Sequence, residues 1–266
     1  MARCCSRAQR MAACMAGRPG VGSCCGGWVA TQTVLCPVSC HLSSFPDPGL
    51  VPAGHQRSVE TVSFSPDSRQ LASGGWDKRV MLWEVQSGQM LRLLVGHRDS
   101  VQSSDFSPTV NCLATGSWDS TIRIWDLRTG TSAVSHQALE GHSGNISCLC
   151  YSASGLLASG SWDKTIHIWK PTTSSLLIQL KGHVTWVKSV AFSPDELWLA
   201  SAGYSRMVKV WDCNTGKCLE TLKQGVLDVA HTCAFTQDGK ILVSGAADQT
   251  RRRMSRTTKS PSDPQT

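Results

Sequence analysis

A ten-residue phrase recurs along this chain, and its spacing constrains the fold more than any other feature. The phrase reads GGWDKRVMLW at 74–83, GSWDSTIRIW at 116–125 and GSWDKTIHIW at 160–169, with a degraded copy, AGYSRMVKVW, at 202–211. Gly-His pairs keep the same rhythm, because the histidines at positions 55, 97, 142 and 183 are 42, 45 and 41 residues apart. Two independent markers with a period near 40–45 residues indicate one structural unit that is written several times.

Each unit reads as four short strands. In the first unit the segments 59–64, 70–75, 79–84 and 90–95 are rich in strand-forming residues, and turn residues such as SPDSR and QSGQ separate them. The apolar runs lack clean alternation, which favours sheets that are covered on both faces. The sequence therefore predicts an all-β fold built from stacked four-stranded blades, that is, a β-propeller.

The recurring Gly-His, Ser/Thr, Asp and Trp positions resemble the repeats of the WD-repeat family over residues 54–250. The resemblance implies four complete repeats, at about 54–95, 96–140, 141–181 and 182–224, and a partial fifth at 225–250. It also implies a clasp in each blade, a hydrogen-bonded chain that joins a turn Asp, the His after Gly, a Ser or Thr and the Trp indole. The predicted clasp residues are His55, Ser73, Asp77 and Trp83; His97, Thr115, Asp119 and Trp125; His142, Ser159, Asp163 and Trp169; and His183, Ser201 and Trp211. In the fourth unit Ser205 stands where the others have Asp.

The fifth unit departs from this pattern, so the array is incomplete against the seven blades that the resemblance implies. Val226 replaces the His, Met254 stands at the Trp position, and RRRMSR occupies the place of an apolar third strand. Three interpretations remain: a small closed ring, an open array with exposed sheet edges, or a product in which an unrelated first exon replaces the leading repeats. We favour the third, because residues 1–53 share no phrase with the repeats. Residues 1–53 are expected to be disordered, and residues 251–266 to form a basic polar tail.

Aromatic residues stand just before the turn Asp in every complete unit, and they are the first candidate binding site. They are Trp76, Trp118 and Trp162, with Tyr204 in the fourth unit. Two positions near the start of each first strand are expected on the same rim beside the central channel. They are Ser58 and Glu60, Ser100 and Gln102, Asn145 and Ser147, Trp186 and Lys188, and Val229 and His231. A ring of aromatics at a concave mouth suits a protein or peptide partner. The alternative is that each Trp only packs on the neighbouring blade.

The motif WDLR at 125–128 is a second candidate. It resembles the W-D-x-R ending with which some WD-repeat proteins dock on the adaptor of a cullin-type ubiquitin ligase, and this implies a substrate receptor in which Arg128 contacts the adaptor. The competing interpretation, which we favour, is that Arg128 is a solvated turn residue, because short motifs match often by chance.

The charge distribution argues against a nucleic-acid partner. The net charge is +7, but the two ends carry all of it: residues 1–53 hold four Arg and one Asp, and residues 251–266 hold four Arg, one Lys and one Asp. Residues 54–250 hold 17 basic and 17 acidic side chains, so no electrostatic field attracts DNA or RNA to the repeats. No apolar run is long enough to span a membrane, so no membrane partner is expected either.

The 13 cysteines indicate neither disulfides nor a cofactor. No C-x-x-C pair occurs, and the cluster at 24, 25, 36 and 40 fits no zinc spacing. We therefore expect a reduced, intracellular setting, cytoplasmic or nuclear, with no metal and no cofactor.

The sequence contains no motif that indicates an enzyme. No nucleophile elbow, P-loop or H-E-x-x-H motif is present. The His–Asp pairs recur once per unit, whereas an active site needs one unique constellation. The expected function is a non-enzymatic interaction scaffold, with the ligase receptor as the alternative and an unstable, truncated array as a third reading.

Overall fold

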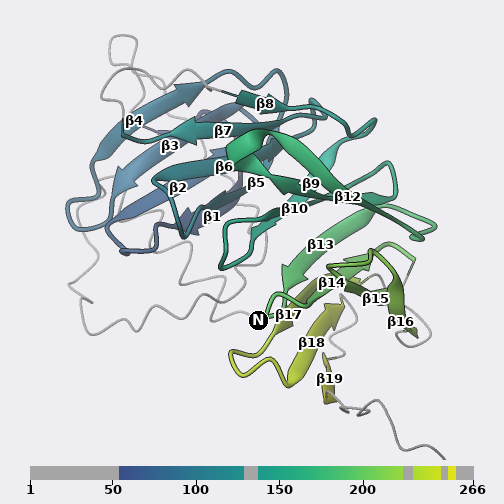
Figure 1. Ribbon diagram of the computed structural model, residues 1–266. Coiled ribbons are helices and arrows are strands. Elements are labelled where there is room, and N and C mark those ends of the chain that lie inside the picture. Colours follow the sequence, from purple (N-terminus) through teal and green to yellow (C-terminus); the bar gives the residue numbers. More distant parts are fainter. Residues whose placement is uncertain (1–53, 129–136, 206, 224–229, 247–250, 256–266) are drawn as a thin grey trace, which may run out of the picture.

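The computed structural model describes residues 54–128, 137–205, 207–223, 230–246 and 251–255 (Figure 1). The segments expected to be disordered or tail-like, 1–53 and 256–266, lie outside these residues. The described chain is almost entirely β, with a single short 3-10 turn, Pro171–Thr173.

Five antiparallel sheets follow one another along the chain, and we call them blades 1 to 5. Blade 1 contains β1 (Val59–Phe64), β2 (Gln70–Gly75), β3 (Arg79–Glu84) and β4 (Met90–Val95). Blade 2 contains β5 (Val101–Phe106), β6 (Cys112–Ser117), β7 (Ile122–Asp126) and β8 (Gln137–Leu139). Blade 3 contains β9 (Ile146–Tyr151), β10 (Leu157–Ser161), β11 (Thr165–Lys170) and β12 (Ser175–Lys181). Blade 4 contains β13 (Val187–Phe192), β14 (Trp198–Gly203), β15 (Met207–Asp212) and β16 (Cys218–Lys223). Blade 5 contains β17 (Ala230–Phe235), β18 (Ile241–Ala246) and β19 (Arg251–Ser255). The prediction of four complete blades and a partial fifth is confirmed.

The blades stack through their first strands. β1 packs against β5, β5 against β9, β9 against β13, and β13 against β17, so the blades follow one another in an arc (Figure 1). Within the described residues, β17 makes no comparable contact with β1. The first strands therefore form the inner wall of the arc, and the fourth strands lie at its outside.

Each junction between consecutive blades has its own apolar core. Between blades 1 and 2, for example, Val80 and Leu82 pack against Val101, Leu113 and Trp125. Because side chains alternate across a strand, the intervening residues of a blade face the other way. This explains why buried residues line both faces of β6, β10 and β14, as the apolar runs predicted.

Blade 1 also has a small core on the side turned away from blade 2. Leu71, Met81 and Trp83 cluster there, with Val62, Val85 and Leu93 packed against them. Trp83 is only 8% exposed. The apolar character of this face is what the repeat pattern predicts for a blade that has neighbours on both sides.

The array extends further toward the C-terminus than the sequence indicated. Residues 251–255, expected to be part of the polar tail, form β19 and pair with β18, with Leu242 opposite Met254. Strand pairing uses backbone groups, so a run of Arg residues can complete a ladder without an apolar pattern. The third strand of blade 5 therefore exists although its sequence does not look like one.

Candidate functional site

Blades 1 to 3 each contain an unbroken chain of hydrogen bonds from a turn carboxylate to an indole. The His Nδ1 atom lies 2.8, 2.9 and 2.7 Å from a carboxylate oxygen in the pairs His55–Asp77, His97–Asp119 and His142–Asp163. The His Nε2 atom lies 2.7, 2.8 and 2.8 Å from the hydroxyl oxygens of Ser73, Thr115 and Ser159. Each hydroxyl also accepts the indole N–H of Trp83, Trp125 or Trp169 at 2.8 Å. The structure thus brings together the residues predicted for these three clasps.

The order of donors fixes the form of the histidine ring. The indole N–H donates to the hydroxyl oxygen, so the hydroxyl hydrogen is left to donate to His Nε2. A neutral ring then carries its hydrogen on Nδ1 and donates it to the carboxylate. Burial by itself raises the pKa of Asp77, Asp119 and Asp163, but the paired histidine, together with further hydrogen bonds to the carboxylate, outweighs burial and holds each pKa below its usual value. The carboxylates therefore stay charged, and the clasp joins the turn to the blade core.

A strained turn presents each of these carboxylates. The residue after the Asp is Lys78, Ser120 or Lys164, with φ of 65°, 65° and 71°, and the left-handed region costs a non-glycine residue about 1–2 kcal/mol. Backbone N–H groups from the loop that carries the histidine offset part of this cost. Gln56, Arg98 and Ser143 donate to the carboxylates of Asp77, Asp119 and Asp163, respectively. The Asp side chains are therefore held as structural acceptors and do not face the solvent as catalytic groups.

Blade 4 keeps only part of its clasp. His183 Nε2 lies 2.6 Å from Ser201 Oγ, which accepts the Trp211 indole N–H at 2.8 Å. Ser205 does not supply a carboxylate, and among the described residues His183 Nδ1 has no hydrogen-bond partner. Burial, with a smaller effect from Lys209, lowers the pKa of His183 to about 4. The His183 ring is therefore neutral. Its Nδ1 carries the hydrogen, and no described atom accepts a hydrogen bond from it.

The four aromatic residues before the turns form one continuous row together with Trp186, which directly precedes β13. We call this row the aromatic rim: Trp76, Trp118, Trp162, Trp186 and Tyr204. Ring centroids are 4.9 Å apart for Trp76–Trp118, 5.4 Å for Trp118–Trp162, 4.1 Å for Trp162–Trp186 and 5.3 Å for Trp186–Tyr204. The rim thus runs across blades 1 to 4. Trp76, Trp186 and Tyr204 are 40%, 40% and 39% exposed, while Trp118 and Trp162 are half-buried between their neighbours.

A repeated bulge positions the polar residues next to this rim. The pairing of β1 with β2 skips one residue between Val59 and Thr61, and that residue is Glu60. The same irregularity falls on Gln102, Ser147 and Lys188 in blades 2 to 4. Bulges re-aim side chains, and here Glu60 accepts the Trp76 indole N–H at 2.6 Å while Lys188 Nζ lies 5.7 Å from the centre of the Tyr204 ring. The sequence placed these residues on the rim without showing the bulge.

An open hollow adjoins the rim at blade 1. It has a volume of about 290 Å³ and is lined by Gln56, Arg57, Trp76, Asp77, Lys78 and Arg79. Three of these side chains are cationic, and Asp77 is already engaged by His55. This end of the rim therefore combines an aromatic surface with positive charge.

Arg128 lies at the end of β7 and is bound by its own strand. Its side chain is 73% exposed and makes a two-pronged ion pair with Asp126, with Nη2 at 2.7 Å from Oδ2. The hydrogen bond and charge of Asp126 raise the pKa of Arg128. The guanidinium is accessible, and an incoming acidic partner would compete with Asp126 for it.

Two buried titratable groups were not identified from the sequence. Asp105, on the inner strand β5, accepts the Tyr151 backbone N–H at 2.7 Å, and burial raises its pKa to about 6. His167 stacks on His142 at 3.8 Å, and burial followed by repulsion from His142 lowers its pKa to about 4. Both groups depend on contacts that a repeat pattern does not encode, because other blades place different residues at these positions.

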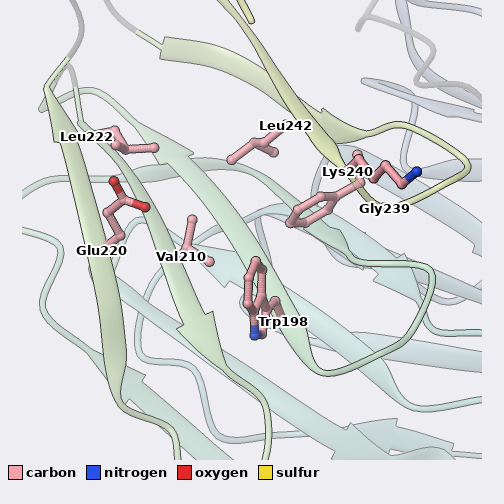
Figure 2. Close-up of a pocket in the computed structure, with 8 residues that line it drawn as sticks. Trp198, Val210, Glu220, Leu222, Gly239, Lys240 and Leu242 are labelled. Atoms are coloured by element: carbon pink, nitrogen blue, oxygen red, sulfur yellow. The ribbon is translucent and has the colours of Figure 1, made fainter. Parts of the chain in front are cut away.

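The junction of blades 4 and 5 contains a small cavity. It has a volume of about 60 Å³ and is lined by Trp198, Val210, Glu220, Leu222, Phe235, Gly239, Lys240 and Leu242. Figure 2 shows Glu220 and Lys240 on opposite sides of it, with Val210 and Trp198 between them. Ligand pockets are about 300–1,000 Å³, so this cavity is a packing gap and not a candidate site.

Nothing in the described part of the chain forms a group of metal-ligating residues. Its cysteine thiols are free, and burial raises the pKa of Cys148, Cys150 and Cys233 to about 12, which makes them poor nucleophiles. A search of the same residues finds no helix with the length and apolarity to cross a bilayer.

Comparison with known proteins agrees with the repeats seen here. The pattern "WD domain, G-beta repeat" matches residues 47–84, 88–126, 133–170, 174–212 and 216–250. The human protein "WD repeat-containing protein 38" is 93% identical over 136 residues, which is 51% of this chain and 43% of that protein. The mouse protein of the same name is 78% identical over 70 residues, or 26% of this chain and 23% of that protein.

A more distant relative aligns over a longer stretch. The rice (Oryza sativa subsp. japonica) protein "Small ribosomal subunit protein RACK1y" is 39% identical over 201 residues, covering 73% of this chain and 59% of that protein. The chain thus spans less than two thirds of the length of each of these three relatives. The repeat matches cover more than half of the chain, and from the second match onward each begins with the fourth strand of one blade and continues into the next blade, so the chain belongs to the WD-repeat family.

Proposed function

We propose that this chain is a non-enzymatic scaffold that binds peptide segments of partner proteins along the aromatic rim. Proteins of this repeat family generally serve protein interactions. The observation that carries the proposal is the unbroken row of five aromatic rings across four blades, three of them about two-fifths exposed. Partially exposed Trp and Tyr side chains are the residues that most often dominate binding energy at interfaces.

The alternative, that the rim serves packing alone, applies to only part of it. Trp118 and Trp162 touch rings on both sides and brace neighbouring blades. Trp186 and Tyr204 lie at one end and Trp76 at the other, and each keeps a large exposed surface. Packing therefore preorganises the row, and its ends remain open to a partner.

The charges beside the rim indicate how a peptide would be oriented. Arg57, Lys78 and Arg79 line the hollow at the blade 1 end. Lys188 adds a cation at the blade 4 end, beside Tyr204. We infer that the rim favours peptides that combine apolar residues with acidic ones. We propose an intracellular setting for the protein. We propose no catalytic, cofactor-binding, nucleic-acid-binding or membrane role.

The proposal is tested by selecting peptides from a random display library on the purified full chain and measuring their affinity for variants. We expect Trp186→Ala and Tyr204→Ala to weaken the selected peptides by about tenfold or more, which corresponds to one hot-spot residue. The matched control is Leu177→Ala, an exposed apolar residue of β12 away from the rim. Equal affinity of all three variants and the unmodified chain would refute binding at the rim.

The ligase-receptor alternative depends on a single accessible residue, Arg128. Under it, Arg128→Ala abolishes co-purification of the cullin adaptor, whereas Arg98→Ala, another exposed arginine, leaves it unchanged. If the scaffold proposal alone is right, neither variant changes the recovery of the adaptor.

A further inference from the structure

The turn of blade 4 contains three buried polar atoms that have no hydrogen-bond partner among the described residues. They are His183 Nδ1, Thr185 Oγ1 and Ser205 Oγ. His183 as a whole is only 6% exposed. Leaving a buried donor unpaired costs about 1–3 kcal/mol, and three such atoms in one turn set blade 4 apart from blades 1 to 3.

The two segments that carry these atoms lie side by side. The Tyr204 backbone N–H donates to the Trp186 carbonyl at 3.1 Å, which holds the segment around 204–205 against the segment around 185–186. The equivalent turn of blade 3 shows how close the two segments are, because a Cβ added to Gly144 would lie 2.8 Å from the Asp163 backbone nitrogen. Gly144 and Asp163 occupy the positions of Thr185 and Ser205.

The chemistry of the three atoms specifies what they can bind. His183 Nε2 accepts from Ser201, so its Nδ1 carries the hydrogen and is a donor. The hydroxyls of Thr185 and Ser205 can also donate. In blades 1 to 3 a carboxylate occupies this position and accepts from the His Nδ1 and from the N–H of the next residue, which in blade 4 is Val184.

We propose that the turn of blade 4 binds the carboxylate group of a ligand, in the position that an Asp side chain fills in the other three blades. The carboxylate belongs either to a small free ion such as formate or to an Asp or Glu side chain of a bound polypeptide. In both cases its oxygens accept from His183 Nδ1 and from the hydroxyls of Thr185 and Ser205.

The three polar atoms are themselves buried, but exposed residues flank them. Val184, Trp186 and Tyr204 surround them in sequence and are 60%, 40% and 39% exposed. The positive charge of Lys209 acts on His183 and also favours an anion there. The inference does not require that peptides bind along the rim, because a free carboxylate can be tested without any partner.

The test is thermal unfolding of the full chain in sodium formate, in N-acetyl-aspartate amide as a mimic of a side chain, and in sodium chloride at equal ionic strength. We expect formate to raise Tm by about 2–4 °C over chloride, which is the response of a chain of this size to a weakly saturated site. Ser205→Asp supplies the carboxylate internally, so it should raise Tm in chloride and remove the response to formate.

A second variant and a second measurement keep the result interpretable. Asp163→Ser creates a similar arrangement in blade 3, without the hydroxyl of Thr185 because Gly144 stands at that position, and should add to the response to formate. If this variant does not fold, histidine NMR of the unmodified chain decides, because formate should raise the pKa of His183 from about 4. Stabilisation by both carboxylates supports a site that accepts a side chain, and stabilisation by formate alone supports a small-ion site. No stabilisation by either, or an equal response in Ser205→Asp, overturns the proposal.

Discussion

Replacing Trp125 by Ala tests whether the clasps and the junctions between blades hold this array together. Trp125 is fully buried and lies in the core that joins blades 1 and 2, with Leu94, Phe106 and Leu113. Its indole N–H donates to Thr115 Oγ1 at 2.8 Å, and Thr115 in turn contacts His97 Nε2 at 2.8 Å. The substitution therefore removes apolar packing and one member of a hydrogen-bonded chain at the same time.

The expected loss follows from the buried area. A buried Trp side chain removes about 150–250 Å² from water, and at about 25 cal/mol per Å² this is worth about 4–6 kcal/mol. A compact unfolded state reduces such figures by about 10–40%, so we expect the free energy of unfolding to fall by about 3–5 kcal/mol, as for other buried aromatics. Trp125→Phe keeps most of the ring and loses the N–H, so it should cost about 1–2 kcal/mol.

The measurement is urea-induced unfolding of the full chain, followed by circular dichroism, with size-exclusion chromatography to check that each variant is monodisperse. Trp76→Ala is the matched control, because Trp76 is the same residue type but 40% exposed. We expect the control to lose about 1 kcal/mol or less. If Trp125→Ala loses less than Trp76→Ala, or if Trp125→Phe costs as much as Trp125→Ala, the reasoning about the clasp and the junction core is wrong.

Three further predictions follow from the same contacts. Trp118→Ala breaks two ring contacts of the rim and should cost about 1–3 kcal/mol in a urea melt; a loss above that range would show that the rim serves mainly packing. Asp105→Asn should raise stability by about 1–2 kcal/mol at pH 7.5 and by about half of that at pH 5, because the folded-state pKa of about 6 lies above the unfolded value near 3.9. The destabilisation by Asp105 begins as the pH rises above the unfolded pKa and is complete above pH 6; an equal gain at both pH values contradicts this. His167 and His183 have folded pKa values of about 4, below the unfolded value near 6.5. The stability that their neutral rings contribute is therefore complete above about pH 6.5, and it falls by about 1–3 kcal/mol in total as the pH drops from about 6.5 to 4. His167→Gln should make stability depend less on pH in thermal melts across this range.

Much of the fold is readable from local sequence. The strands predicted at 59–64, 70–75, 79–84 and 90–95 coincide with β1 to β4. Turn residues delimit each strand, and the same order of strand and turn residues recurs along the repeats. The clasp residues of blades 1 to 3 could be named because the repeats resemble those of the WD-repeat family, which implies this hydrogen-bonded chain. A period of about 42 residues places the same residue types at the same points of each blade, so the same side chains meet inside blades 1 to 3.

The contacts between blades were decided only by the tertiary structure. The sequence showed four aromatic residues at equivalent positions and Trp186 at another position of the rim, but not that their rings touch in one row, since this depends on the angle at which consecutive blades stack. It showed that Ser205 replaces an Asp, but not that His183, Thr185 and Ser205 would be left with unpaired polar atoms together. Nor did it show that the Arg-rich segment 251–255 pairs as β19, because backbone hydrogen bonds alone are enough to form that ladder. A repeat therefore determines the blade and its clasp, while the surface between blades, where a partner or a carboxylate can bind, depends on how unequal copies of that repeat pack side by side.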